Sequence, residues 1–322
     1  MAADLPAARR APLRRRRAAV DGARGGNGSR GGHPARATLR ARHGYAFVAA
    51  YLVLLLAFGV LPAGYAIYLS LTNSAGQLVG LGNFTAAAAD FRFLPAFAHI
   101  GVYLVIWLVA LVAGVVGLAL LLHGRMRRTT ATLRFLYYLP GALAGVASVL
   151  VWLFMLDPTV SPVGGPLKSL GYTTFAQVIE PSHLPVVLAV IAFWTGAGGW
   201  IVIMYGALNN IPGDLIEAAR IDGAGPLQVA RRIQVPMLRK WIAYMVILAF
   251  ATGSQLFVEP QIVGEASLGA ISNSWSPNQL AYLFAFQANN FHSAAALSVD
   301  LLVLGLICAA IIVTRSGLFD LE

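Results

Sequence analysis

Few side chains of this chain could do chemistry, and the best-defined group lies between two long apolar segments. Residues 217–224 read Glu-Ala-Ala-Arg-Ile-Asp-Gly-Ala. Glu217 and Asp222 are acids in a stretch that otherwise carries arginines, so each can form an ion pair. Glu217 can pair with Arg220 or Arg231, or with a basic residue of a partner protein. A solvated loop beside a membrane is the plainer alternative.

One further acid, Asp300, lies well inside an apolar run. A charge within a membrane span costs several kcal/mol on most scales, which means that the carboxylate should face a cavity or a partner. The alternative is that the side chain extends to the nearer membrane interface.

The remaining reactive side chains do not indicate catalysis or a bound metal. Cys308 is the one cysteine and lies in an apolar run, which excludes an internal disulfide and a cysteine metal cluster. His99, His183 and His292 are far apart in sequence, and we interpret them as polar anchors at the membrane interface. The run 165–169 lacks the glycine that a phosphate-binding loop needs before its lysine. We expect no ATP hydrolysis, no cofactor and no metal in this chain.

The elements that position these residues are membrane spans. Of the 322 residues 58% are hydrophobic and 11% charged, against about one quarter charged in soluble domains, and the mean hydropathy is +0.71. Apolar runs of about 18 or more residues predict transmembrane helices. We therefore predict an all-α integral membrane protein with six transmembrane helices. The six runs are 45–72, 97–122, 135–156, 184–208, 240–258 and 293–314.

The basic residues predict how the spans are oriented. If the N-terminus is inside and the spans alternate, the inside segments hold 21 of the 23 lysines and arginines. The outside segments hold only Arg92 and Lys168. This asymmetry follows the positive-inside rule and predicts cytoplasmic N- and C-termini. The longer connections, 73–96, 157–183 and 259–292, are then outside loops.

The chain is expected to have two parts. Residues 1–43 carry 11 arginines and little apolar content, which predicts a disordered, Arg-rich cytoplasmic tail. We interpret the tail as an anchor beside anionic membrane lipid, with nucleic-acid binding as the alternative that we do not favour. Residues 44–322 form the six-span transmembrane domain, with a cytoplasmic loop at 209–239.

That loop has the signals of two short helices. Pro212 and Asp214 suit a helix start, and Gly223 can end the helix in the left-handed conformation. Gly225-Pro226 then begins a second helix, and Pro236 ends it or begins the next span. Two short helices with a glycine bend make a compact unit that can transmit a rigid-body push.

The same loop resembles the EAA signature of binding-protein-dependent ABC importer permeases. The signature positions are Glu217, Ala218, Ala219, Asp222, Gly223, Ala224, Ile233 and Pro236. The resemblance implies that these residues form coupling helices that contact an ATPase subunit. Ala230 departs from the pattern, because many carbohydrate-type members carry an aromatic residue there.

Other stretches resemble the carbohydrate branch, the relatives of maltose and glycerol-phosphate permeases. They include Gly80–Phe84, Leu139-Pro140, Asn209–Pro212 and Ala294–Ser298. The resemblance covers 45–322 and implies a type I ABC importer-like permease in a bacterial inner membrane. The implied partners are a second homologous permease, two ATP-binding subunits that hold ATP and Mg, an extracytoplasmic solute-binding protein and membrane lipid, but no nucleic acid.

A sugar pathway needs polar groups for hydroxyls and aromatic faces for the apolar side of the ring. The candidates that follow from the resemblance are Trp152, Trp194, Trp200, Tyr205 and Asp300. Packing against lipid or a neighbouring helix is the alternative for each aromatic residue. The glycines at 196–199 permit either a broken helix or a close helix approach. A permease for a non-sugar solute, such as a polyol phosphate, and a secondary transporter remain the alternative functions.

Overall fold

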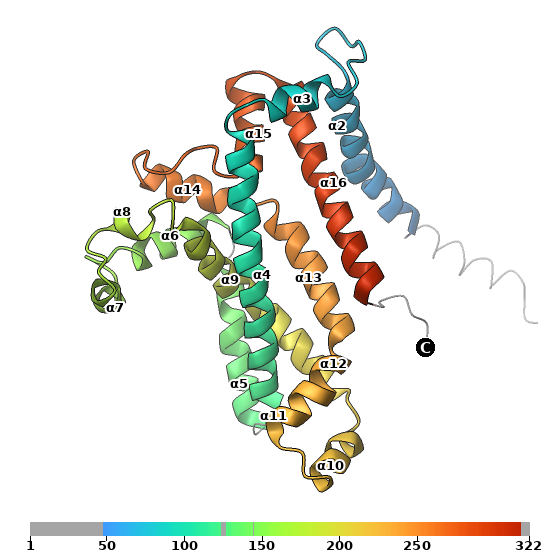
Figure 1. The fold of residues 1–322 in the computed structure, drawn as a ribbon, viewed down its shortest axis with the longest axis vertical. Coiled ribbons are helices and arrows are strands. Elements are labelled where there is room, and N and C mark those ends of the chain that lie inside the picture. The colour runs from blue at the N-terminus through green and yellow to red at the C-terminus, as the bar shows by residue number, and fades with distance from the viewer. Residues whose placement is uncertain (1–47, 124–126, 144, 317–322) are drawn as a thin grey trace, which may run out of the picture. The chain divides into compact units, whose positions relative to one another are not determined.

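The computed structural model describes residues 48–123, 127–143 and 145–316. The chain divides into two units, Met1–Leu56 and Ala57–Glu322. The described part of the first unit, residues 48–56, is helical and continues into the second unit, and the elements that follow η1 all belong to the second unit (Figure 1). The Arg-rich tail at 1–43 lies outside the described residues, so its expected disorder stays a prediction.

The predicted all-α class is confirmed for the described residues. Their β structure is limited to an isolated antiparallel bridge between Thr72 and Leu78. The helical elements are η1 (Leu56–Val60), α2 (Leu61–Leu71), α3 (Gly82–Ala88), α4 (Phe93–His123), α5 (Arg127–Tyr138), η2 (Leu139–Ala142), α6 (Val146–Met155), α7 (Gly164–Ser169), α8 (Phe175–Val178), α9 (Leu184–Asn209), α10 (Gly213–Ile221), α11 (Pro226–Val229), η3 (Ala230–Gln234), α12 (Val235–Met237), α13 (Arg239–Gly253), α14 (Val258–Ala266), α15 (Pro277–Tyr282), η4 (Leu283–Gln287) and α16 (Phe291–Ser316).

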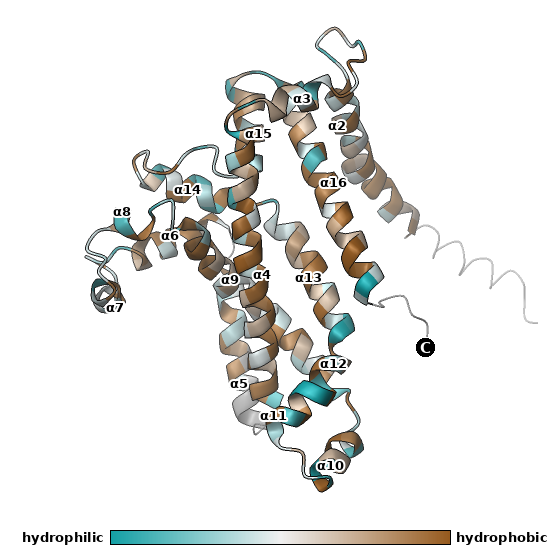
Figure 2. Ribbon diagram, viewed as in Figure 1, coloured by the Kyte–Doolittle hydropathy of each residue, from teal (hydrophilic) through white to brown (hydrophobic). Residues whose placement is uncertain are grey.

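Four of the predicted spans are long continuous helices. They are Val48–Leu71, α4, α9 and α16, with 24, 31, 26 and 26 residues. At about 1.5 Å rise per residue each exceeds the roughly 30 Å of a bilayer core. The brown, hydrophobic colour runs along most of α4 and α16 in Figure 2.

The expectation of a continuous helix over 135–156 was wrong. Its two halves, Phe135–Ala142 and α6, are bent by 108°. Pro140 removes a backbone donor, and the chain then passes through Gly145 at φ +65°. These two residues interrupt a run that is apolar enough to be one helix.

The fifth predicted span also differs from the expectation. The segment Pro226–Met237 meets α13 at a 65° bend, and α13 ends at Gly253 instead of continuing to 258. Its 15 residues reach about 22 Å, less than the apolar thickness of a bilayer. The described residues therefore contain four spans, or up to six if each bent pair counts as one.

The connections predicted as loops contain short helices. α3 lies in 73–96, α7 and α8 lie in 157–183, and α14 and α15 lie in 259–292. A capping box starts α15: the Gln279 N–H donates to Ser276 Oγ, and the Ser276 N–H donates to Gln279 Oε1, both at 3.2 Å. The spacing of Ser276 and Gln279 in the sequence suits a capping box. The helices of this connection, α14 and α15, are too short for a pattern of apolar residues to predict them.

The main core forms where α4 packs along α9. Its fully buried side chains include Leu111 and Val115 from α4 and Leu188, Ile201 and Met204 from α9. Glycines allow close approaches around this pair. The ring of Phe193 fills the space where Gly114 lacks a side chain, and Trp107 does the same at Gly253 of α13.

The closest of these approaches involves backbone. A Cβ at Gly198 of α9 would collide with the carbonyl group of Tyr137. The neighbouring Gly199 has open space at its Cβ position. Of the two possibilities for the glycine run, the structure shows close approach, because α9 is continuous from Leu184 to Asn209.

Gly198→Ala should therefore destabilise the protein by about 1–3 kcal/mol, the usual cost of overpacking a tight contact. Gly199→Ala is the matched control and should be neutral or stabilise by about 0.5–1 kcal/mol, since alanine is the better helix former. Thermal unfolding of both purified variants in detergent measures the difference. Equal melting temperatures would contradict the close contact at Gly198.

Candidate functional site

We call residues 209–239, predicted to contact an ATPase, the coupling segment. Its first helix, α10, begins after Pro212, has Asp214 in its first turn and Arg220 in its last turn. This agrees with the predicted start, because an acid near the N-terminus and a base near the C-terminus both suit the helix dipole. The signature residues Glu217 and Ala218 are exposed on this helix.

The end of α10 is a Schellman motif built from the signature residues. Gly223 has φ +83°. Its N–H donates to the carbonyl of Arg220 at 3.0 Å, and the N–H of Ala224 donates to the carbonyl of Ala219 at 2.9 Å. Ala219 and Ala224 are half-buried, and Asp222 is the exposed C-cap residue. The Asp-Gly-Ala part of the signature thus has a backbone reason, which the expected glycine bend only partly captured.

The second half of the coupling segment is a helix with a π turn. α11 follows Gly225, and η3 follows α11. The Val235 N–H bonds to the carbonyl of Ala230, five residues back, immediately before Pro236, which has no N–H to donate. Ile233 is half-buried and Pro236 is exposed.

Buried residues anchor the coupling segment at both ends. Ile211 at its start and Leu238 at the bend before α13 belong to the main core, and Leu238 is 1% exposed. Val229 is also buried, within α11. Because the two ends are packed, a displacement of α10–α12 must be carried into α9 and α13.

Large apolar side chains are exposed between these anchors. Ile221 is 86% exposed and Leu227 81%, and both lie beside the glycine bend. The carboxylate of Glu217 makes no ion pair with Arg220 or Arg231 in the described part of the chain. Exposed apolar residues and an unpaired acid in one segment are typical of a surface that meets another protein. The sequence analysis had not singled out Leu227.

The predicted pathway aromatics form two edge-to-face pairs. Trp152 of α6 meets Trp194 of α9 at 5.7 Å between ring centroids, and Trp200 of α9 meets Tyr244 of α13 at 6.0 Å. Of these four, Trp152 and Trp200 pack against the main core. The buried Nε1 of Trp152 has no hydrogen-bond partner within the described residues, a donor that water or a solute would satisfy. Tyr205 lies apart, with its ring 6.4 Å from His123.

Asp300 does not join these aromatics. It lies on α16 in a separate groove of about 510 Å³ that is otherwise mostly apolar, with Phe84 of α3 and Phe97 of α4. Its carboxylate has no hydrogen bond or ion pair in the residues that the structure describes. The structure therefore does not bring the five predicted pathway residues together: Trp152 contacts Trp194, while Trp200, Tyr205 and Asp300 have other neighbours.

A largely apolar cavity that the sequence analysis missed lies among α2, α13, α15 and α16, and we call it the polar cavity after the four uncharged polar residues in its lining. It has about 500 Å³, and its polar lining residues are Ser254, Gln255, Asn278 and Ser298. Ser254 and Ser298 donate to carbonyls of their own helices at 3.1 and 3.0 Å, which leaves their oxygens free to accept. The available signal was a set of uncharged polar residues at the ends of apolar runs.

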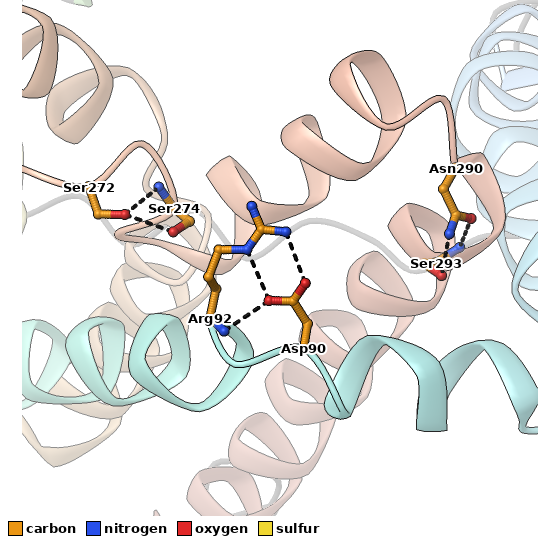
Figure 3. A network of polar contacts seen from close by, with 6 residues as sticks. All are labelled: Asp90, Arg92, Ser272, Ser274, Asn290 and Ser293. Carbon is orange, nitrogen blue, oxygen red and sulfur yellow. Dashed lines mark hydrogen bonds and ion pairs between the residues drawn. The ribbon is translucent and has the colours of Figure 1, made fainter. Parts of the chain in front are cut away.

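The end of the unit that carries α3 and α15 is held by polar contacts. Arg92 donates from Nε and Nη2 to the two carboxylate oxygens of Asp90, each at 2.9 Å (Figure 3). These bonds lower the pKa of Asp90. On α16, the Asn290 side chain donates to Ser293 Oγ at 3.0 Å. The Asn83 side chain donates to the carbonyls at the end of α2, at 2.8 Å to Thr72.

The three histidines that were weighed as a metal site lie near different backbone carbonyls. The Nδ1 atoms of His99, His183 and His292 are 3.3, 3.2 and 3.0 Å from the carbonyl oxygens of Trp275, Gln177 and Leu69. The structure thus gives each one a separate polar contact, and their role as anchors at the membrane interface stays a prediction.

Residues 118–318 match the family described as "Binding-protein-dependent transport system inner membrane component". The match covers more than half of the chain, which therefore belongs to this family. The protein is a multi-pass permease of the bacterial inner membrane and part of an ABC importer. It has no ATPase domain, and ATP is bound by a partner ATPase.

Individual relatives cover most of the chain. The diacetylchitobiose uptake system permease protein NgcF of Streptomyces coelicolor is 28% identical over 307 residues, 88% of this chain and 86% of the relative. The osmoprotective compounds uptake permease protein GgtC of Synechocystis is 32% identical over 228 residues, 66% and 79% of the two chains. The sn-glycerol-3-phosphate permease UgpA of Escherichia coli is 27% identical over 283 residues, 83% and 91%.

A solved structure shares the fold. A chain of the bacterial alginate ABC transporter, in complex with an alginate pentasaccharide-bound periplasmic protein, superposes with a TM-score of 0.70 at 19% identity. The match covers 87% of this chain and 96% of that one. The likeness supports the helical permease architecture.

The Schellman motif predicts a specific effect of Gly223→Ala. A Cβ there meets no atom within 4 Å, so the cost is the positive φ alone, about 1 kcal/mol. Amide exchange at Gly223 and Ala224 should become about fivefold faster, as measured by hydrogen–deuterium exchange of the purified protein. Gly213→Ala, in the first turn of the same helix, is the control and should leave exchange unchanged. No change in either variant would argue against the motif.

Proposed function

We propose that this chain forms half of the transmembrane pathway for a sugar or oligosaccharide that an extracytoplasmic binding protein delivers. A second homologous permease forms the other half, and two ATP-binding subunits drive the import. The observation that carries the choice of substrate is the cavity of Ser254, Gln255, Asn278 and Ser298, whose described lining combines these uncharged polar groups with apolar walls and has no charged residue. The name of the diacetylchitobiose relative NgcF supports it.

The chemistry of the cavity suits hydroxyl groups. Primary amides both donate and accept hydrogen bonds, as sugar hydroxyls do. Neither Gln255 nor Asn278 has a side-chain hydrogen bond in the described residues, so both are available to a solute. The alanine and leucine side chains that line the other walls suit the apolar faces of a sugar ring.

The predicted aromatic residues are assigned to the same route further along α9 and α13. Trp200 and Tyr244 meet between these helices, and Tyr244 is 47% exposed. Trp152 and Trp194 contribute the unpaired indole donor near the core. Tyr205 and Asp300 lie away from both groups, and we do not assign them to the sugar route.

We place the coupling segment in the cytoplasm, as the distribution of basic residues predicts. Figure 1 shows α10 and α11 at one end of the second unit and α3 and α15 at the other. A displacement of α10–α12 is transmitted to α9 next to Ile211 and to α13 next to Leu238. Because these helices carry Trp200 and Tyr244, the movement reaches the proposed route as a rigid-body displacement.

A polyol phosphate is the second candidate substrate, favoured by the glycerol-3-phosphate relatives. Phosphate monoesters are bound by arginine, lysine or clustered N–H donors. The described lining of the polar cavity contains no cation, which favours a neutral solute. The family assignment argues against secondary transport, the third alternative.

The function is tested by purifying the chain from its native membrane with its partners and reconstituting the assembly in proteoliposomes. We expect a second permease, an ATPase and a binding protein to co-purify, and labelled sugar to accumulate only with ATP inside and binding protein outside. A labelled polyol phosphate serves as the competing substrate. ATP-independent uptake by this chain alone would refute the proposal. Selective uptake of the polyol phosphate would show that the substrate is a phosphate ester and not a sugar.

The cavity is tested with Gln255→Ala and Asn278→Ala. Loss of one neutral hydrogen bond should reduce sugar uptake at limiting concentration by about threefold to tenfold for each variant. Gln287→Ala and Asn273→Ala remove the same groups from exposed positions that do not line the cavity, and should leave uptake unchanged. If the cavity and control variants take up sugar equally well, the cavity is not part of the transport route.

A further inference from the structure

Three cationic side chains surround a pocket at the elbow between α12 and α13. The pocket has about 550 Å³. Its described lining is Arg232, Ile233, Pro236, Met237, Arg239 and Lys240, and no acid is among them. The charges of Arg232 and Arg239, without an acid in the same lining, favour an anionic ligand.

The elbow lies where the chain enters the membrane. The segment Pro226–Met237 meets α13 at 65°, and the apolar part of α13 begins directly after Arg239 and Lys240. In Figure 2 the hydrophilic colour gathers between α11 and α12, where η3 lies, and at the start of α13. Arginines are expensive within the hydrocarbon, so η3, which carries Arg232, and the first residue of α13, Arg239, lie at or outside its boundary. The pocket is therefore at headgroup depth.

An exposed apolar side chain lines the pocket, and an exposed aromatic residue follows it in the chain. Met237 is 46% exposed in the pocket wall, and Trp241, one residue after Lys240, is 44% exposed. Exposed tryptophan near a membrane boundary is typical of the interfacial belt. Cations for a headgroup and exposed apolar surface for acyl chains thus lie next to each other.

We propose that this pocket binds the phosphate group of an anionic phospholipid. Arg232 and Arg239 hold the phosphate oxygens, and Lys240 adds a third charge. Met237 and Trp241 contact the first part of the acyl chains. The bound lipid bridges α12 and α13 and so stabilises the elbow that joins the coupling segment to the pathway. The site does not depend on which solute is transported.

The test uses the transporter complex, purified in detergent, depleted of lipid and titrated with phosphatidylglycerol or phosphatidylcholine. Native mass spectrometry counts the lipid bound. The double variant Arg232→Gln with Arg239→Gln should bind phosphatidylglycerol about tenfold to thirtyfold more weakly than the unmodified complex. Phosphatidylcholine should bind weakly to both.

The matched control is Arg231→Gln with Arg315→Gln. It removes the same charge from two exposed arginines that do not line the pocket, and phosphatidylglycerol binding should be unchanged. If the pocket double variant does not fold, Arg239→Gln alone should weaken binding about fivefold. Equal loss in pocket and control variants, or no loss in either, would show that no defined site exists.

Two further measurements distinguish other sources of the anion. Inorganic phosphate at millimolar concentration should not displace phosphatidylglycerol from the complex. Displacement at that concentration would assign the pocket to a soluble phosphate instead of a lipid. If phosphatidylglycerol binds only after the ATPase subunits are removed, the pocket is part of the ATPase contact and the lipid assignment is wrong.

Discussion

Close packing at glycine is the constraint on which the rest of this structure depends. Lipid tails are as apolar as the helices, so the hydrophobic effect does not hold one span against another. Complementary packing of side chains and backbone must therefore hold the helices together. Phe193 fills the space at Gly114, and Trp107 fills the space at Gly253. Gly198 lets α9 approach the carbonyl group of Tyr137. These contacts join α4, α9, α13 and the bent third span into a frame with little freedom to slide. A movement imposed on one helix therefore moves its neighbours.

The coupling segment can act on that frame because it is stiff for reasons of its own. The Schellman motif satisfies the last carbonyls of α10 with the N–H groups of Gly223 and Ala224. Pro226 then starts α11 at a position where a backbone N–H would have no partner within the helix, so its missing N–H costs no hydrogen bond. Ile211 and Leu238 fix the two ends in the core. Ile221 and Leu227 remain exposed between these anchors. In the proposed function they form the surface that a partner contacts, and the helices beneath them are held in place.

Local signals were enough to predict some elements and not others. Pro212, Gly223 and Pro226 specify helix ends through their own backbone chemistry, and the structure has helix ends there. The four long spans needed only length and hydropathy. The break at Pro140–Gly145 was missed because each residue alone is tolerated in a span, and only the packing around η2 decides that the chain turns. The cavity of Gln255 and Asn278 joins residues 23 positions apart through α14, a proximity that periodicity does not encode.

The short helix α13 brings the separate parts of the molecule together. Its first residues line the basic pocket, its middle presents Tyr244 to Trp200, and Ser254 and Gln255 follow its last turn in the polar cavity. A helix of about four turns is too short to bend gradually, so a tilt at Leu238 displaces the far end by an amount set by its length of about 22 Å. A longer span would reach across the bilayer with slack at both ends. α13 instead ends at Gly253, where Trp107 fills the space of the missing side chain, and under the proposed function this short helix carries a tilt at the elbow to the cavity.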